Sequence, residues 1–169
     1  MPALDAIRMI VFDVDGVLTD GSVIVDDHGI ESKRFHVRDG FGLKAAMLGG
    51  LKVGVLTGRS TRAVSLRMIE LGIDLLAQGV SDKRIGLEQL CQRAGVLPEE
   101  TAYVGDDLID LPAMLLCGYA IAVADAVAEV REQAAFVTTA PGGQGAAREA
   151  VEHLLKAQGR WDAVVDRYV

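Results

Sequence analysis

The sequence predicts an α/β fold built on a doubly wound, mainly parallel sheet, with a small β-hairpin inserted after the first strand. Short runs that are apolar throughout alternate with segments of helical pattern, and the runs are bounded by Gly, Asp or Thr. Strands that are apolar at every position suit a parallel sheet that helices cover on both faces. At 169 residues the chain is expected to form one domain over 1–169.

The elements follow one another in the order that this fold requires. Six apolar runs are predicted strands: 8–13, 52–57, 74–78, 101–106, 119–123 and 135–139. Six other segments are predicted helices: 42–50, 61–72, 82–95, 110–118, 126–134 and 145–158. The segment 22–37 breaks the alternation, because extended stretches flank "DDHG", which has a turn composition. We expect it to project as a hairpin, and 142–169 to form a tail.

Composition excludes several classes of function. The formal net charge of -7 would repel a long phosphate backbone, so we expect no nucleic-acid partner. No apolar run reaches the roughly 20 residues of a membrane span, and "MPALDAIRMIVFD" lacks the features of a signal peptide. We therefore expect a cytoplasmic protein without membrane contact. The two cysteines, Cys91 and Cys117, are too few for a tetrahedral zinc site.

Acidic and hydroxyl side chains gather at predicted strand ends. "VFDVDGVLTDG" places Asp13 and Asp15 one residue apart after the first strand, and Thr57 and Asp106 end two others. Ligands of open α/β sheets bind at the carboxyl ends of strands. A second charge beside a buried carboxylate is costly unless the pair works around a cation. A hard ion such as Mg2+ takes carboxylate, carbonyl and water oxygens and leaves room for phosphate, so we predict a Mg2+ site here.

Four motifs in order, "DVDG", "TGR", "SDK" and "GDDLID", resemble the signatures of haloacid dehalogenase-type phosphatases. The longer stretches "FHVRDGFGLK", "YVGDDLIDLP" and "GGQGAAREA" narrow the resemblance to the 3-deoxy-D-manno-octulosonate (KDO) 8-phosphate phosphatases. The resemblance implies Mg2+-dependent hydrolysis of KDO 8-phosphate to KDO and phosphate, in lipopolysaccharide precursor biosynthesis. A sister group that acts on nine-carbon sialic-acid-type 9-phosphates is the alternative substrate class.

The resemblance also implies roles for the strand-end residues. Asp13 would attack phosphorus and form an aspartyl-phosphate, and Asp15 would act as general acid and then general base. The metal ligands would be the carboxylates of Asp13 and Asp106 and the backbone carbonyl of Asp15. Alternatively, Asp15 begins a turn and Asp106 caps a helix.

Other residues would support the phosphoryl group. Thr57 and the N–H of Gly58 would donate to its oxygens, and Lys83 would supply a fixed positive charge. Asp107 and Asp110 would orient waters or Lys83. The alternatives are a structural hydroxyl at Thr57 and a solvated lysine at Lys83.

A substrate with a remote carboxylate needs further cations. Arg59 follows the phosphate-binding pair, and Arg67 lies about two helical turns on, so both could bind the carboxylate. Alternatively, both arginines form surface ion pairs. The resemblance adds further substrate-binding residues: His36, Val37, Arg38, Asp39, Gly40, Lys44 and Arg148.

The resemblance implies a homotetramer whose active sites are completed by neighbouring subunits. The hairpin would present apolar side chains such as Val23, Val25, Ile30 and Phe35, which partners should cover. The segment 142–150 would fold over a site on an adjacent subunit; alternatively, it is a loop that caps the last helix.

Two other classes of function stay open. A receiver-type signalling domain also phosphorylates an Asp beside acidic metal ligands, but its phosphorylated Asp ends a later strand, whereas here Thr57 and Gln78 stand at those ends. A catalytically silent oligomerisation module would not require Thr57, Lys83 and Asp106 at three strand ends.

Overall fold

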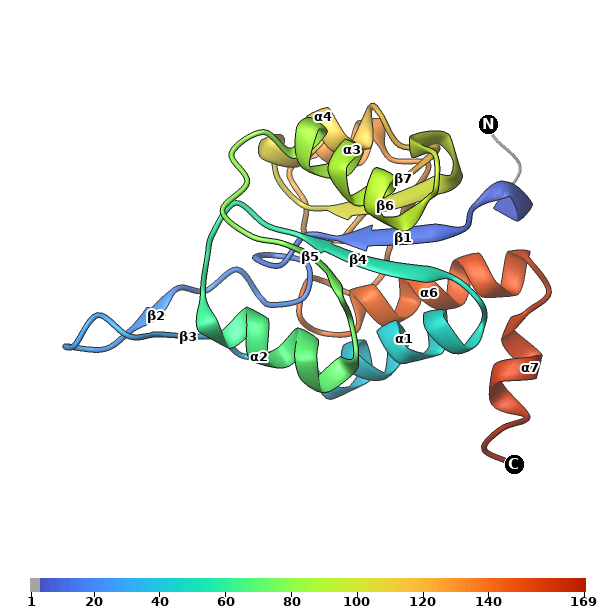
Figure 1. Cartoon of the computed structure of the whole chain (residues 1–169), viewed down its shortest axis with the longest axis horizontal. Helices are drawn as coiled ribbons and strands as arrows, with labels where there is room; N and C mark the ends of the chain where they lie inside the picture. The colour runs from blue at the N-terminus through green and yellow to red at the C-terminus, as the bar shows by residue number, and fades with distance from the viewer. Residues whose placement is uncertain (1–3) are drawn as a thin grey trace.

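A parallel sheet of six strands forms the centre of the structure, a computed structural model that describes residues 4–169 (Figure 1). Its spatial order is β5-β4-β1-β6-β7-β8, and each neighbouring pair is parallel. The strands are β1 (Met9–Phe12), β4 (Lys52–Leu56), β5 (Leu75–Ala77), β6 (Thr101–Gly105), β7 (Tyr119–Ala122) and β8 (Phe136–Val137). The predicted fold class is confirmed, and each predicted strand corresponds to an observed one.

Helices cover both faces of the sheet, as the apolar strands require. Every residue of β1, β6 and β7 is buried. In Figure 1, α1, α2 and α6 lie below the sheet, and α3 and α4 lie above it. The α-helices are α1 (Val37–Leu48), α2 (Arg62–Leu71), α3 (Lys83–Ala94), α4 (Leu111–Met114), α5 (Ala128–Gln133), α6 (Ala146–Ala157) and α7 (Trp161–Val165). Residues 4–169 also contain three short 3-10 helices: η1 (Leu4–Ala6), η2 (Pro98–Glu100) and η3 (Leu108–Asp110).

The first helix begins five residues before the predicted 42–50. Gly40 and Gly42 lower helix propensity and delay the predicted start. The structure gives both glycines a packing reason: a Cβ on Gly40 would lie 2.2 Å from Arg67 Nη2, and one on Gly42 would lie 2.7 Å from Arg148 Cα. Their absent side chains let α2 and α6 approach α1. "HVRDG" therefore lies at the start of α1, with His36 as the N-cap residue.

Two further expectations about helices need correction. The predicted helix 110–118 is a 3-10 turn followed by the four residues of α4, and α7 was not predicted. Asp110 is held by four polar contacts described below, which fix the chain at the junction of η3 and α4. The short α7 spans only five residues, too few for a helical period to show in the sequence.

The hairpin consists of β2 (Ile24–Val25) and β3 (Glu31–Ser32), which pair antiparallel and project from the body of the molecule (Figure 1). Val23, Val25 and Ile30 are each more than half exposed. Phe35 is different, because it is partly buried against the main core, and the expectation that it lies exposed on the hairpin is wrong. Among residues 4–169, none of the helices has the length and apolarity needed to cross a membrane.

Candidate active site

The carboxyl ends of β1, β4 and β6 meet beside a cavity. The strand order reverses at β1, with β4 on one side and β6 on the other, and ligands of open α/β sheets bind at such a switch point. A cavity of about 230 Å³ lies there. It is lined by Asp13, Asp15, Gly21, Thr57, Gly58, Arg59, Asp106, Asp107 and Ile109. The structure thus brings together the predicted strand-end residues.

A buried lysine connects two of the carboxylates. Lys83, the first residue of α3, is 2 % exposed, and its Nζ lies 2.9 Å from Asp13 Oδ1 and 2.6 Å from Asp110 Oδ1. The alternative that Lys83 is a solvated helix-start lysine is wrong. Asp82 caps the helix by accepting hydrogen bonds from the N–H groups of Arg84 and Ile85, which fixes where Lys83 enters the site.

Asp110 organises the acidic loop rather than facing the cavity. Its Oδ1 accepts hydrogen bonds from Lys83 and from the Tyr103 hydroxyl, at 2.6 and 2.7 Å. Its Oδ2 accepts from the N–H groups of Asp106 and Asp107, at 2.9 and 3.3 Å. Asp107 caps η3 instead of contacting Lys83, because its side chain accepts from Leu108 N–H at 2.7 Å. Tyr103 was not predicted, since a tyrosine within an apolar strand carries no functional signal.

Two carboxylates remain available for a metal ion. One oxygen each of Asp13, Asp106 and Asp110 lie within 4.8 Å of one another, but both oxygens of Asp110 already accept hydrogen bonds. Asp106 also lies against the backbone beside Asp15, because a Cβ on Gly16 would be 2.0 Å from Asp106 Oδ2. Two carboxylates next to a backbone turn form an oxygen donor set that fits a hard divalent cation such as Mg2+.

Burial and the crowding of negative charge disfavour the ionised forms of Asp13 and Asp106. Burial, with the negative charge of Asp110, raises the pKa of Asp13 to about 7 against the attraction of Lys83. Burial and the charges of Asp110 and Asp13 raise the pKa of Asp106 to about 8. A divalent cation between the two would favour their ionised forms, because an opposite charge offsets the cost of burial.

The chain matches known phosphatases along nearly its whole length. Residues 72–149 match the family model of haloacid dehalogenase-like hydrolases. The 3-deoxy-D-manno-octulosonate 8-phosphate phosphatase of Escherichia coli (strain B / BL21-DE3) is 44% identical over 162 residues, which cover 96% of this chain and 86% of that protein. This chain belongs to the KDO 8-phosphate phosphatase family. It is a phosphoric monoester hydrolase, so the receiver-type and silent-module alternatives are wrong.

Solved structures of the family agree with this fold. The cobalt-bound phosphatase from Haemophilus influenzae has a TM-score of 0.92 and 43% identity, covering 95% of this chain and 94% of that one. The Moraxella catarrhalis phosphatase, in complex with a magnesium ion, a phosphate ion and a KDO molecule, has a TM-score of 0.95 and 39% identity, covering 99% and 96%. Two relatives with this fold have therefore been solved with a bound metal ion, one of them also with phosphate and KDO.

The remaining predicted site residues of the phosphatase either line the cavity, as Thr57 does, or lie elsewhere in the chain. Thr57 is buried at the cavity and accepts a hydrogen bond from Arg59 N–H at 3.3 Å, so its own hydrogen can point toward a ligand. The second group does not line this cavity in the same chain: His36, Val37, Arg38, Asp39, Gly40, Lys44, Arg67 and Arg148. Their contribution to substrate binding stays a prediction that requires another subunit.

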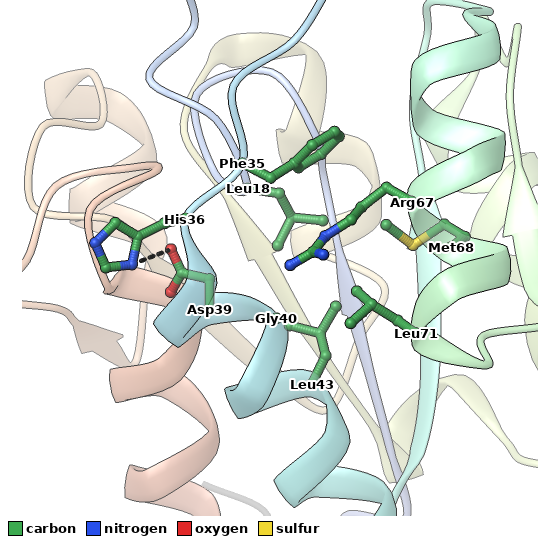
Figure 2. A pocket seen from close by; sticks show the side chains of 9 residues that line it. All are labelled: Leu18, Phe35, His36, Asp39, Gly40, Leu43, Arg67, Met68 and Leu71. Atoms are coloured by element: carbon green, nitrogen blue, oxygen red, sulfur yellow. Dashed lines mark ion pairs between the residues drawn. The ribbon is translucent and has the colours of Figure 1, made fainter.

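Both predicted carboxylate-binding arginines form ion pairs. Arg59 lines the cavity, and its Nη2 lies 2.6 Å from Glu31 Oε2. Arg67 pairs with Glu70 at 2.8 Å and points from α2 toward the start of α1, between Phe35 and Gly40 (Figure 2). The pocket there holds only about 10 Å³, too small for a sugar. Both arginines therefore form ion pairs in this chain, and carboxylate binding by either one stays a prediction.

Asp39 and the glycines of the tail have structural contacts in the phosphatase. The buried Asp39 carboxylate accepts hydrogen bonds from the N–H groups of Gly145 and Arg148, at 3.1 and 2.9 Å, and so anchors the start of α6 to α1. A Cβ on Gly142 would lie 1.7 Å from Gly16 O, so the tail segment packs behind the Asp15–Gly16 turn of its own chain. Arg148 stacks over Phe41 and Trp161, away from the cavity.

Gly16→Ala is expected to weaken Mg2+ binding at least about tenfold, because the new Cβ would displace Asp106 from the metal site. Gly16 also has a φ of +87°, which costs an alanine roughly 1–2 kcal/mol. Gly72→Ala is the matched control: its φ is +74°, but a Cβ there meets nothing within 4 Å. Calorimetric titration with Mg2+ distinguishes the two, and equal Mg2+ affinity in both variants would contradict the placement of Asp106.

Stability without metal should fall as pH rises. The unfolded chain releases the protons of Asp13 and Asp106 near the ordinary value of 3.8, whereas the folded chain keeps them to about 7 and about 8. The stability that these raised pKa values contribute is complete below pH 3.8 and is lost progressively up to about pH 8. Thermal melts in EDTA and in Mg2+ should show a larger gain from Mg2+ at about pH 8.5 than at about pH 5.5. A gain independent of pH would contradict the prediction.

Proposed function

We propose that this enzyme hydrolyses KDO 8-phosphate to KDO and phosphate with Mg2+, through an aspartyl-phosphate on Asp13. The observation that carries the proposal is the strand-end cavity, in a fold shared with the Moraxella catarrhalis phosphatase that was solved with magnesium, phosphate and KDO. The reaction belongs to lipopolysaccharide precursor synthesis. We place it in the cytoplasm, because a phosphorylated sugar acid is too highly charged to cross a bilayer unaided.

In the first step, an oxygen of Asp13 attacks phosphorus as the bond from phosphorus to the sugar oxygen breaks. Lys83 holds Asp13 by one oxygen at 2.9 Å, which orients the carboxylate for attack. The Thr57 hydroxyl and Gly58 N–H donate to the phosphoryl oxygens. Asp15 gives its proton to the departing sugar oxygen, so that KDO leaves as an alcohol.

In the second step, water attacks phosphorus and the bond to Asp13 breaks. Asp15, now ionised, accepts a proton from the water, which restores its starting state. Asp13 and Asp106 with the backbone carbonyl of Asp15 would hold Mg2+. When bound, Mg2+ neutralises charge on the phosphoryl oxygens.

Release of phosphate from KDO 8-phosphate tests the function. We expect turnover with Mg2+, complete loss in excess EDTA and recovery when Mg2+ is returned. Phosphate release that is unchanged by EDTA would contradict the metal requirement. The absence of turnover with Mg2+ present would contradict the proposed substrate.

We also propose a homotetramer in which a neighbouring subunit completes each active site. Two features support it: the exposed apolar residues of the hairpin, and a cavity of about 230 Å³, below the roughly 300–1,000 Å³ of typical small-molecule sites. The cationic residues outside the cavity, such as Arg67 and Lys44, would then serve the neighbour's substrate.

Mixing two impaired variants tests this assembly. If Arg67 serves a neighbour, Arg67→Ala should lower catalytic efficiency with KDO 8-phosphate about ten- to a hundredfold. Mixed tetramers of Arg67→Ala and Asp13→Asn subunits should then regain part of the activity, because some sites receive Asp13 from one subunit and Arg67 from another. A monomer by light scattering, or mixtures no more active than their separate parts, would contradict shared sites.

A further inference from the structure

A lysine directly after the second hairpin strand, β3, places a buried ammonium group beside the active-site residue Asp15. Lys33 follows β3 directly, and its side chain is only 1 % exposed, although the next residue, Arg34, has a side chain that is 77 % exposed. The Lys33 ammonium donates to Asp15 Oδ1 and lies 2.9 Å from Glu31 Oε1. A buried ammonium is costly unless it is paired, and here two carboxylates pair it.

The pairing continues across the site to the loop after β4. Glu31 accepts hydrogen bonds from Arg59 Nη2 at 2.6 Å and Nε at 3.4 Å, a two-pronged contact. Arg59 and Lys33 lower the pKa of Glu31 to about 2, so this carboxylate stays ionised near neutral pH. Acidic and basic side chains therefore alternate from Asp15 through Lys33 and Glu31 to Arg59. They join the loop after β1, the hairpin and the loop after β4.

Lys33 does not line the cavity but contacts Asp15, which does. Asp15 and Arg59 both line the cavity, whereas Lys33 lies behind Asp15 and is not among the lining residues. A carboxylate that transfers a proton must be held within hydrogen-bond reach of the sugar oxygen. One of its oxygens is fixed by Lys33, which leaves the other to face the substrate.

We propose that Lys33 is a positioning residue for proton transfer by Asp15, and that the Glu31–Arg59 pair holds Lys33 in place. The proposal rests on the proposed function, in which Asp15 protonates the leaving sugar. It gives the hairpin a second task beside any contact with a partner: it completes the active site of its own chain. A lysine in the polar segment "ESKRF" carries no sequence signal for this role, because its partner lies 18 residues away.

Lys33→Met tests the proposal with KDO 8-phosphate as substrate. The variant keeps the length of the side chain and removes its charge. We expect kcat to fall about ten- to a hundredfold, because the hydrogen bond that the Lys33 ammonium donates to Asp15 is lost. KM should change less than about threefold, since Lys33 does not touch the substrate. Arg34→Met is the matched control: it removes an exposed cation at the next position, paired with Asp20, and should keep kcat within about twofold.

A double-mutant cycle separates positioning from a general structural effect. In the Asp15→Asn background no acid remains to be positioned, so adding Lys33→Met should lower kcat by less than about twofold further. If Lys33→Met does not fold, Lys33→Arg replaces it in the cycle, because arginine keeps the buried charge. The loss of kcat in Lys33→Arg should be smaller than in Lys33→Met, and it should also vanish in the Asp15→Asn background.

The outcomes are distinguishable from those for the function itself. Equal losses in the wild-type and Asp15→Asn backgrounds, a loss confined to KM, or unchanged kcat in the Lys33 variants would each overturn the positioning role. Failure of the wild-type enzyme to hydrolyse KDO 8-phosphate would overturn the proposed function, on which the proposal depends.

Discussion

Asp13→Asn is expected to lower turnover at least about 10⁴-fold while the protein stays folded, since loss of a nucleophile removes the covalent route. The amide has nearly the shape of the carboxylate, but it cannot attack phosphorus to form an acyl phosphate. The substitution also removes one charge from a crowded site in which burial raises the pKa of Asp13 to about 7. We therefore expect the melting temperature without metal at neutral pH to stay the same or rise.

Phosphate release and a thermal melt measure the two effects of Asp13→Asn together. Asp74→Asn is a suitable control, because Asp74 is exposed and precedes β5 at the opposite end of that strand from the cavity. It should keep turnover within about twofold. Turnover of Asp13→Asn close to the wild-type value would contradict the covalent mechanism.

Lys83→Met is expected to reduce both stability and turnover. It leaves Asp13 and Asp110 buried without their shared cation, and breaking a buried ion pair from one side typically costs about 3–5 kcal/mol. For a chain of this size that corresponds to a fall of roughly 6–20 °C in melting temperature. Turnover should fall at least about a hundredfold, because Asp13 loses the contact that orients it.

Lys156→Met provides the matched control for Lys83→Met. Lys156 also pairs with a carboxylate, that of Glu152 at 2.7 Å, but on the exposed surface of α6. Such pairs contribute about 0–1 kcal/mol, so the control should melt near the wild-type temperature. Equal melting temperatures for the two lysine variants would contradict the assigned role of the Lys83 pairs.

The strand ends could be predicted from the sequence because each rests on a local pattern. β1, β4 and β6 are apolar runs that stop at Asp13, Thr57 and Asp106, and a parallel sheet brings such ends to one edge. The substrate class followed from motifs that span the chain. Local sequence patterns and the geometry of a parallel sheet were enough to predict which residues form the acidic site.

Features that depend on contacts between residues far apart in the sequence could not be predicted. The start of α1 was missed because Gly40 and Gly42 are unfavourable in helices, and only the approach of α2 and α6 explains them. Lys33 was missed because a lysine in a polar segment is normally solvated. Its burial depends on Glu31, two residues before it in β3, and on Asp15, which lies 18 residues away and reaches it only in the fold.

A competition between two substrates tests the central claim most directly. The enzyme is given equal concentrations of KDO 8-phosphate and a nine-carbon sialic-acid-type 9-phosphate with Mg2+, and the two free sugar acids are quantified at low conversion. The product ratio equals the ratio of kcat/KM values. We predict that KDO is formed at least about tenfold faster, whereas preferential release of the nine-carbon sugar acid would contradict the assignment to KDO 8-phosphate.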